Sequence, residues 1–468
     1  MEQQKAEKPI GAGNPIRALS QSWQAGVEKY FPDAFVFALV LSFIVIIMGM
    51  VLQRETPWTM VKYWGDGFWA FLAFAMQMAL ILVLGYALAA APTVRRGITR
   101  LARASKSDWQ SYLIGMTTSW VAGYISWGLG MIVAAFVARE TCHWRKGLHY
   151  GFTVAINYTA LMVGVVGGLT ITAPLLVNTP GHFMTDFFEE IGITGGLIPL
   201  TQTIWSPSLV VMVVGGFACF IGIAYAMRPR RGVDEIKEIS PEVLETLDKD
   251  AMVIPRPFRP SVAERLDYNR TIWGIIVALG AGYLIYFWVT RGLASVGLNA
   301  MNFFILFLGL GLHGSPIHYV RALARGAYVC APILLQFPFY AGIQGMMIHS
   351  GLAATIAGWI VGVATPITFP FLNFVQACVI NMFIPSAGGQ YMVTAHFMHT
   401  AGHALGVPAS TVVNSYTMGD ICTNAVQPFW ALPMLGVAGL GIRDIWGWCL
   451  VGSLTFFVIA TIICFAIL

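Results

Sequence analysis

The longest stretch without basic residues constrains this chain most. From Gly326 to Ile442 the sequence has no Lys and no Arg, and its only carboxylate is Asp420. Lys and Arg collect in the cytoplasmic loops of membrane proteins, so this stretch predicts embedded protein with loops on the other side. Composition agrees, because only 10% of residues are charged, against roughly 25% in soluble domains. A lone acid in such a stretch is a candidate functional residue.

Repeated apolar runs predict one all-α polytopic membrane unit. Roughly 20 apolar residues cross the hydrocarbon core of a bilayer. By that rule we expect nine spans, at about 34–52, 68–91, 149–178, 207–227, 271–290, 296–312, 327–349, 408–433 and 446–468. The basic residues stand in short clusters between these runs, which indicates membrane topology and no nucleic-acid face. The seven cysteines show no disulfide framework and no metal spacing.

Two apolar regions contain residues that break helices. Region 111–138 is interrupted by the run Ser126–Gly130, and region 368–398 by Pro385–Gly389. Irregular backbone at membrane depth is tolerated only where protein buries it or where it lines a wet cavity. Both regions are therefore expected to be re-entrant helical hairpins.

The distribution of charge favours the same topology. Basic residues in the first 30 positions place the N-terminus in the cytoplasm, and the loop 228–270 carries nine basic residues. The segment from Thr179 to Ser206 has none and falls outside if 111–138 is re-entrant. Arg291 is the exception, because this topology leaves it outside. Segments 93–107 and 316–326 are basic and amphipathic, which is typical of interfacial helices.

The two halves are expected to be inverted repeats. An ungapped shift of 259 residues superposes the two breaks, aligning Ser126 with Pro385. An odd span between the halves turns the second one upside down, which is a transporter design. The expected parts are a cytoplasmic segment 1–30, a first repeat 31–227, a cytoplasmic linker 228–270, a linking helix 271–291 and a second repeat 292–468.

The hairpin tips are the candidate substrate site. Half-helices aim the partial positive charge of their N-termini at such tips, where a small carboxylate can bind without Arg. The alternative is that the glycines only allow close helix packing. The candidates are Ser126, Trp127, Gly128, Gly130, Pro385, Ser386, Ala387, Gly388, Gly389 and Gln390, with Thr170 and Thr172 from the segment 157–181.

Asp420 is the candidate coupling residue. A carboxylate at mid-membrane costs about 2.5–3.5 kcal/mol on insertion scales, so it stays protonated or pairs with a cation. Asn424 lies four residues on and shares its helical face. Thr423 and Asn157 are further candidate ligands for H⁺ or Na⁺. The alternative is an acid near a segment end that faces water.

A histidine cluster supports the competing hypothesis of a membrane-embedded hydrolase or acyl- or lipid-modifying enzyme. His396, His399 and His403 have the spacing of one helical face, but the Glu of a His-Glu-x-x-His motif is missing. We therefore expect no metal, no cofactor and no catalytic residue.

The chain resembles the bacterial short-chain fatty acid transporter family from about Phe31 to its end. The segments that carry this resemblance are Trp64–Trp69, Gln336–Gln344, Ile384–Gly389, Ala438–Ile445 and the long, specific element Gln427-Pro428-Phe429-Trp430-Ala431-Leu432-Pro433. Two positions depart from the family pattern: Ala387 stands where a Gly is expected, and Asp420 where members have Glu.

The resemblance implies uptake of small carboxylates such as acetoacetate or butyrate across a bacterial inner membrane. It also implies cation symport with H⁺ or Na⁺ and membership of a wider ion-transporter group built from inverted repeats and re-entrant hairpins. Homodimers are common in that group. Ala387 leaves the exact substrate open, and the shorter side chain of Asp420 leaves the coupling ion open.

Overall fold

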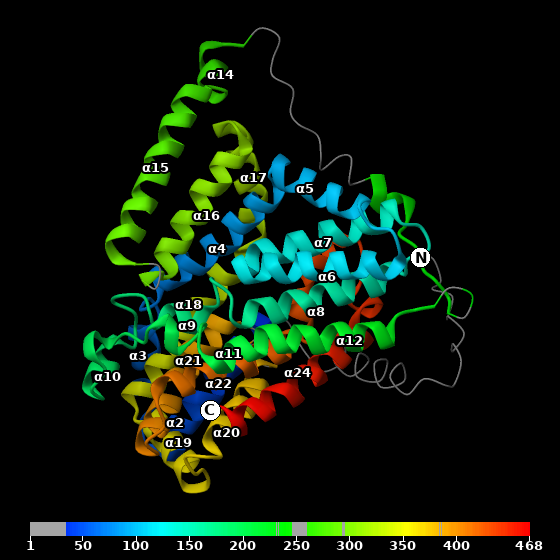
Figure 1. Cartoon of the computed structure of the whole chain (residues 1–468). Helices are drawn as coiled ribbons and strands as arrows, with labels where there is room; N and C mark the ends of the chain where they lie inside the picture. Colours follow the sequence, from blue (N-terminus) through cyan, green and yellow to red (C-terminus); the bar gives the residue numbers. More distant parts are fainter. Residues whose placement is uncertain are drawn as a thin grey trace, which may run out of the picture.

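The protein is all-helical in the part described by the computed structural model, shown in Figure 1. The described residues are 34–230, 232, 234–245, 260–292, 295–382, 384 and 386–468. The expected cytoplasmic segment 1–30 and residues 246–259 of the linker lie outside them. The all-α prediction is confirmed for the described ranges.

The first half contains the helices up to Met227. They are α2 (Ala34–Leu52), α3 (Pro57–Gly67), α4 (Leu72–Ala90), α5 (Pro92–Arg103), α6 (Asp108–Ile125), α7 (Trp127–Trp144), α8 (Tyr150–Val166), the short α9 (Thr172–Leu176) and α10 (Thr185–Glu190), and α11 (Pro207–Val210), which continues through the π-helical turn Val211–Gly215 into α12 (Gly216–Met227).

A short α14 (Val262–Asp267) and the long α15 (Arg270–Arg291) connect the halves, and α15 lies at the edge of the molecule in Figure 1. The second half contains α16 (Leu298–His313), α17 (Pro316–Val329), α18 (Ala331–His349), α19 (Leu352–Val363), α20 (Phe369–Asn381), α21 (Ala387–Ala404), α22 (Ala409–Asn424), α23 (Pro428–Ala438) and α24 (Trp446–Ala466).

The helix boundaries of the first half recur in the second. The first residues of α3, α4 and α8 are 57, 72 and 150, and those of α17, α18 and α22 are 316, 331 and 409, so each pair is separated by 259 residues. For α5 and α19, and for α7 and α21, the separation is 260. Within the described residues, helix α15 has no such counterpart. The observed periodicity agrees with the shift that superposes the two sequence breaks.

Several helices have the length and apolarity of membrane spans. Four described segments are both long enough and apolar enough to cross a membrane: α4, the continuous stretch Pro207–Met227, the stretch Val262–Arg291 and α24. The bent pair α17 and α18 adds a fifth if it is counted as one span. Shorter apolar helices are α8, α16, α19, α20 and the part Ala38–Leu52 of α2. Nine spans therefore remain a prediction.

Two predicted spans are wrong in their extent. The region 149–178 is α8 followed by the short α9, because the chain leaves the helix at Gly167 and Gly168. The region 408–433 is α22 and α23, which are separated because Pro428 lacks the amide hydrogen that continues a helix. Helices α3 and α19 lie outside all the predicted spans.

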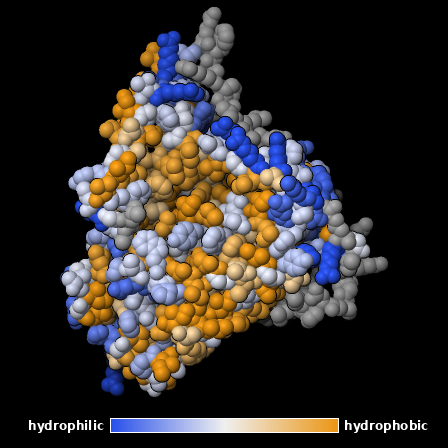
Figure 2. Space-filling model, viewed as in Figure 1, coloured by the Kyte–Doolittle hydropathy of each residue, from blue (hydrophilic) through white to orange (hydrophobic). Residues whose placement is uncertain are grey.

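The two predicted amphipathic segments are helices α5 and α17. Ile98 and Ala102 of α5 are buried, and α5 packs on α7. Arg103 lies over the ring of Trp144, with its guanidinium carbon 3.8 Å from the ring centroid. In Figure 2 the most hydrophilic residues gather along the upper and right edges, and apolar surface fills much of the remaining face. An extensive apolar surface of this kind is typical of a membrane protein.

Glycines allow the first helices to approach backbone to backbone. A Cβ added to Gly130 of α7 would lie 2.8 Å from the Cα of Gly123 in α6. A Cβ on Gly85 of α4 would lie 2.6 Å from the carbonyl carbon of Gly128, at the start of α7. Because the neighbours are backbone atoms, they cannot rotate away. Small residues are needed for such close helix contacts in membranes.

The Gly85 contact predicts a sharp steric effect. We expect Gly85→Ala to lower the free energy of unfolding by about 1–3 kcal/mol, the usual cost of overpacking. Gly274→Ala in α15 is the matched control, since nothing lies within 4 Å of an added Cβ there. Thermal unfolding of both variants in detergent checks the prediction, and equal melting temperatures would contradict it.

Candidate substrate and ion site

The first hairpin consists of α6 and α7 and breaks at Ser126. This residue is extended (φ −160°, ψ 130°), so α6 ends at Ile125 and α7 begins at Trp127. The segment after α8 satisfies the freed backbone: the Trp127 amide donates to Thr170 Oγ1 at 3.0 Å, and the Leu169 amide donates to the Tyr124 carbonyl at 2.7 Å. Ser126 is fully buried, and its Oγ has no hydrogen-bond partner among the described residues.

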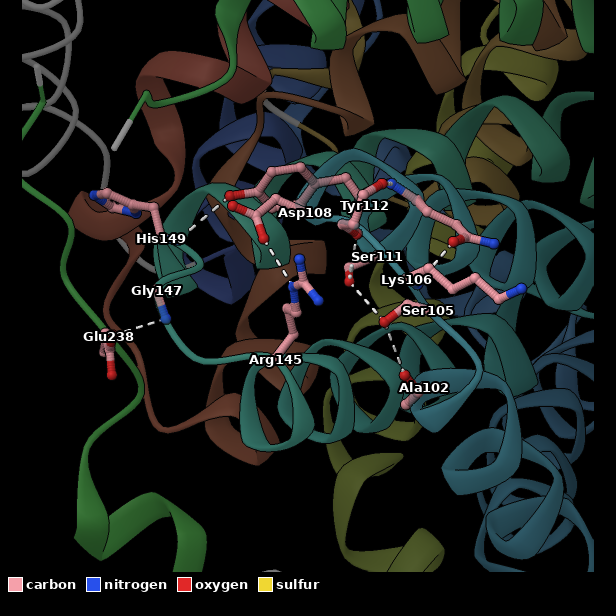
Figure 3. A network of polar contacts seen from close by, with 12 residues as sticks. Ala102, Ser105, Lys106, Asp108, Ser111, Tyr112, Arg145, Gly147, His149 and Glu238 are labelled. Carbon is pink, nitrogen blue, oxygen red and sulfur yellow. Dashed lines mark hydrogen bonds and ion pairs between the residues drawn. The ribbon is translucent and has the colours of Figure 1, made fainter. Parts of the chain in front are cut away.

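Polar contacts connect the ends of α6 and α7 that lie away from the break at Ser126 (Figure 3). Arg145, just after α7, donates from Nε to Asp108 Oδ1 in the first turn of α6 at 2.8 Å. Glu238 of the linker accepts from the Gly147 amide at 2.7 Å. The two ends of the hairpin therefore lie at the same end of the molecule, as a re-entrant hairpin requires.

The second hairpin consists of α20 and α21. Ser386 caps α21, because its Oγ accepts a hydrogen bond from the Gly389 amide at 3.2 Å. Tyr416 of α22 donates its hydroxyl to the Ala387 carbonyl at 2.6 Å. Gln390 ties the two helices together by donating to the Ala377 carbonyl at 2.8 Å. Pro385, a predicted site residue, lies outside the described residues.

A cavity joins the tips of both hairpins. Its volume is about 40 Å³. It is bounded by Trp127 at the start of α7, by the first residues of α21, by Thr172 of α9 and by Asn424 of α22. The complete lining is Met78, Trp127, Met131, Leu161, Met162, Val165, Ile171, Thr172, Ile333, Phe337, Ser386, Ala387, Gly388, Ile421, Asn424 and Trp430.

The cavity wall is largely apolar, and its polar groups come from a few positions. The described residues that line it include no Lys, Arg or His. Thr172, Ser386 and Asn424 supply the polar side chains, and the N-termini of α7 and α21 supply partial positive charge. Small-molecule sites have this combination of an apolar wall with a few placed polar groups.

The sequence candidates fall into three groups. Six of them line the cavity: Trp127, Thr172, Ser386, Ala387, Gly388 and Asn424. Gly128 and Thr170 lie directly beside this lining at the first tip. Gly130 and Gly389 are absent from the lining: a Cβ added to Gly130 would meet Gly123 and Leu161, and one added to Gly389 would meet the ring of Tyr340. Gln390 holds the second hairpin together.

Asp420 lies beside the cavity in a dense polar cluster. Its carboxylate is 1% exposed, Oδ1 accepts from Asn424 Nδ2 at 3.1 Å, and Oδ2 has no partner among the described residues. The Asn381 amide nitrogen donates to the Asp420 carbonyl at 2.9 Å and lies 2.8 Å from both Thr423 Oγ1 and Asn424 Oδ1. Asn381 Oδ1 is also without a described partner. Such oxygens are the ligands of hard cations.

Asn157 lies apart from the contacts of this cluster. Its Nδ2 donates to the Ala134 carbonyl of α7 at 3.4 Å, and its Oδ1 lies 2.6 Å from a Cβ added to Gly115 of α6. The sequence reasoning missed Asn381 and the methionines of the cavity. The position of Asn381, four residues before the break at Pro385, could have indicated it.

The histidine candidates do not share a common centre. His399 Nε2 forms a hydrogen bond with the Tyr391 hydroxyl at 2.8 Å, while His396 packs on the ring of Phe187 with centroids 4.9 Å apart. His403 is exposed. Within the described ranges no group of three or more His, Cys, Asp or Glu side chains could hold a metal ion.

Comparison with known proteins decides the family. A model of the short chain fatty acid transporter family matches residues 15–468. The chain belongs to the short-chain fatty acid transporter family. A relative from Haemophilus influenzae is 36% identical over 442 residues, covering 93% of this chain and 96% of that protein. A relative from Escherichia coli K12 is 36% identical over 439 residues, covering 94% of this chain and 97% of that protein. Both are provisionally named as short-chain fatty acid transporters.

Two solved structures share the fold. The Alcanivorax borkumensis YdaH transporter matches with a TM-score of 0.58 at 15% identity, over 92% of this chain and 98% of its own. MtrF of Neisseria gonorrhoeae matches with a TM-score of 0.58 at 15% identity, over 95% of this chain and 97% of its own. Its structure is described as illuminating a class of antimetabolite efflux pumps. The family model and the two relatives confirm the expected family. The protein is a bacterial membrane transporter of a small molecule and not an enzyme.

The Asn381 contacts generate a prediction. Asn381→Ala removes the donor shared by three oxygens of α22, so we expect a stability loss of about 1–3 kcal/mol. Should the cluster bind a coupling cation, as proposed below, the variant would need a roughly tenfold higher cation concentration for half-maximal transport, equivalent to about 1.4 kcal/mol.

Asn414→Ala is the control for this prediction. Asn414 is a buried amide of α22, ten residues before Asn424, and it donates to the Gln202 carbonyl and to Ser206 Oγ, away from the Asp420 cluster. This variant should lose stability and keep its ion dependence. The ion role of Asn381 is refuted if both variants shift the ion dependence alike or if neither does.

Proposed function

We propose that the protein is a secondary active transporter that takes up short-chain fatty acid anions, such as acetoacetate or butyrate, together with H⁺ or Na⁺. It would act in the bacterial inner membrane with its N-terminus in the cytoplasm. The observation that carries this proposal is the cavity between the two hairpin tips, because its described lining has no basic side chain and a buried acid lies beside it.

Charge balance supports the cation. An isolated carboxylate in apolar surroundings is strongly destabilised unless it is paired or neutralised. The N-termini of α7 and α21 supply only about half a unit of positive charge each. Asp420 adds a negative charge when it is ionised. A bound Na⁺, or a proton on Asp420 or on the substrate, would restore neutrality, so substrate and cation would bind together.

The proposed architecture is an inverted repeat. Residues 31–227 and 292–468 would form the repeats, with 271–291 as the linking helix and with α6–α7 and α20–α21 as re-entrant hairpins in a nine-span protein. The recurrence of helix boundaries at 259–260 residues supports this arrangement, and so does the positive-inside rule. Movement of a hairpin-bearing unit against a fixed scaffold would alternate access, and two copies would pair as a homodimer.

Uptake into proteoliposomes tests the proposed function. We expect accumulation of labelled butyrate or acetoacetate when an inward Na⁺ or H⁺ gradient is imposed, and only equilibration without one. The gradient that drives accumulation identifies the coupling ion. Folded protein that accumulates neither acid under either gradient would refute the proposal, and empty liposomes supply the background.

Asp420 tests the coupling step. We expect Asp420→Asn to abolish accumulation, because an amide of the same size can neither release a proton nor neutralise Na⁺. Asp66→Asn is the control, since Asp66 is an exposed carboxylate in α3. The measurement is the ratio of internal to external substrate at steady state. Full accumulation by the Asp420 variant would refute its coupling role.

A further inference from the structure

Three methionines from three different helices meet at the cavity. They are Met78 of α4, Met131 of α7 and Met162 of α8. All are buried, with exposed fractions of 3%, 1% and 5%. Methionine is unbranched and flexible, so it adapts to the shape of an apolar neighbour. A wall of this kind is suited to a hydrocarbon chain.

The three methionines differ in their polar contacts. Thr172 Oγ1 donates to Met78 Sδ at 3.7 Å, which associates Met78 with a polar edge of the cavity. Met131 lies one helical turn beyond Trp127, the first residue of α7. In the sequence of α8, Met162 stands between Leu161 and Val165, which also line the cavity. Among the described residues no side chain donates to the sulfur of Met131 or Met162, so we assign these two to the apolar part of the wall.

We propose that Met131 and Met162 set the length of the carbon chain that the transporter accepts and select a straight-chain acid of about four carbons. This inference rests on the proposed function, because it assigns the apolar wall to the substrate tail and the hairpin tips to its carboxylate. The two methionines are specificity-determining residues that touch the tail.

The size of the cavity supports this chain length. A site needs about 10–15 Å³ to hold one water-sized group. The observed volume of about 40 Å³ is therefore enough for only a few such groups. A methylene is similar in size to a water molecule, so a cavity of this size suits a short acid better than a long one. Longer chains would have to displace Met131 or Met162.

Truncation of either methionine should lengthen the preferred substrate. Met→Ala removes three heavy atoms, which frees space for two or three methylenes. The experiment is competition: unlabelled straight-chain acids of two to eight carbons compete with labelled butyrate for uptake into proteoliposomes. Each buried methylene contributes ~0.8 kcal/mol, so the affinity should rise about fourfold with each carbon added. In the unmodified protein this rise should stop at four carbons. In Met131→Ala or Met162→Ala the rise should continue to six or seven carbons.

Controls separate this effect from lost stability. Met116→Ala is matched, because Met116 is a fully buried methionine of α6 that is absent from the cavity lining. Its length profile should equal that of the unmodified protein. Met162→Leu nearly conserves volume and should keep the optimum at four carbons. Met162→Phe should shift the optimum to two or three carbons, so the proposal remains testable if an alanine variant fails to fold.

The outcomes distinguish two failures. If the unmodified protein takes up butyrate but Met131→Ala, Met162→Ala and Met162→Phe keep its length profile, the methionine inference is overturned and the proposed function stands. If the unmodified protein takes up no acid of the series, the proposed function itself fails. A parallel shift in Met116→Ala would also overturn the inference, because the effect would not be specific to the cavity.

Discussion

A hydrocarbon bilayer offers no hydrogen bonds to a polypeptide backbone, so each interruption of a helix must be satisfied by the protein. The structure meets this requirement at both hairpin tips with hydroxyl groups. Thr170 accepts from the Trp127 amide, and Ser386 accepts from the Gly389 amide. Tyr416 donates to the Ala387 carbonyl. The cavity lies where these two breaks meet, since Trp127 of the first tip and Ser386 of the second both line it.

The same breaks require close packing. Gly85, Gly123 and Gly128 allow α4, α6 and α7 to approach within backbone contact. Larger residues would separate these helices and expose the unpaired groups of the tip. The glycine-packing interpretation and the site interpretation of the hairpins are therefore complementary. Glycines hold the helices together around the tip, while Trp127 and Ser386 face the space between the tips.

Much of this arrangement is predictable from the sequence, because Gly, Pro and Ser interrupt long apolar runs at Ser126 and near Pro385. The division of 149–178 into α8 and α9, and the helices α3 and α19, were missed because length and apolarity do not reveal how a chain turns within a buried region. Asn381 was missed for another reason. A single amide in an apolar run has no periodic signal, and its role depends on contacts with α22, a segment about forty residues away.

The two halves resemble each other in helix boundaries but differ in side chains. At the first tip the Trp127 amide donates to the hydroxyl of Thr170. At the second, Asn381 connects α20 to the Asp420 turn of α22. When Asp420 binds a proton or a cation, the net charge beside the second hairpin changes. In the proposed coupling the second hairpin therefore responds to the ion, while the first supplies Trp127 and Met131 to the wall that contacts the substrate.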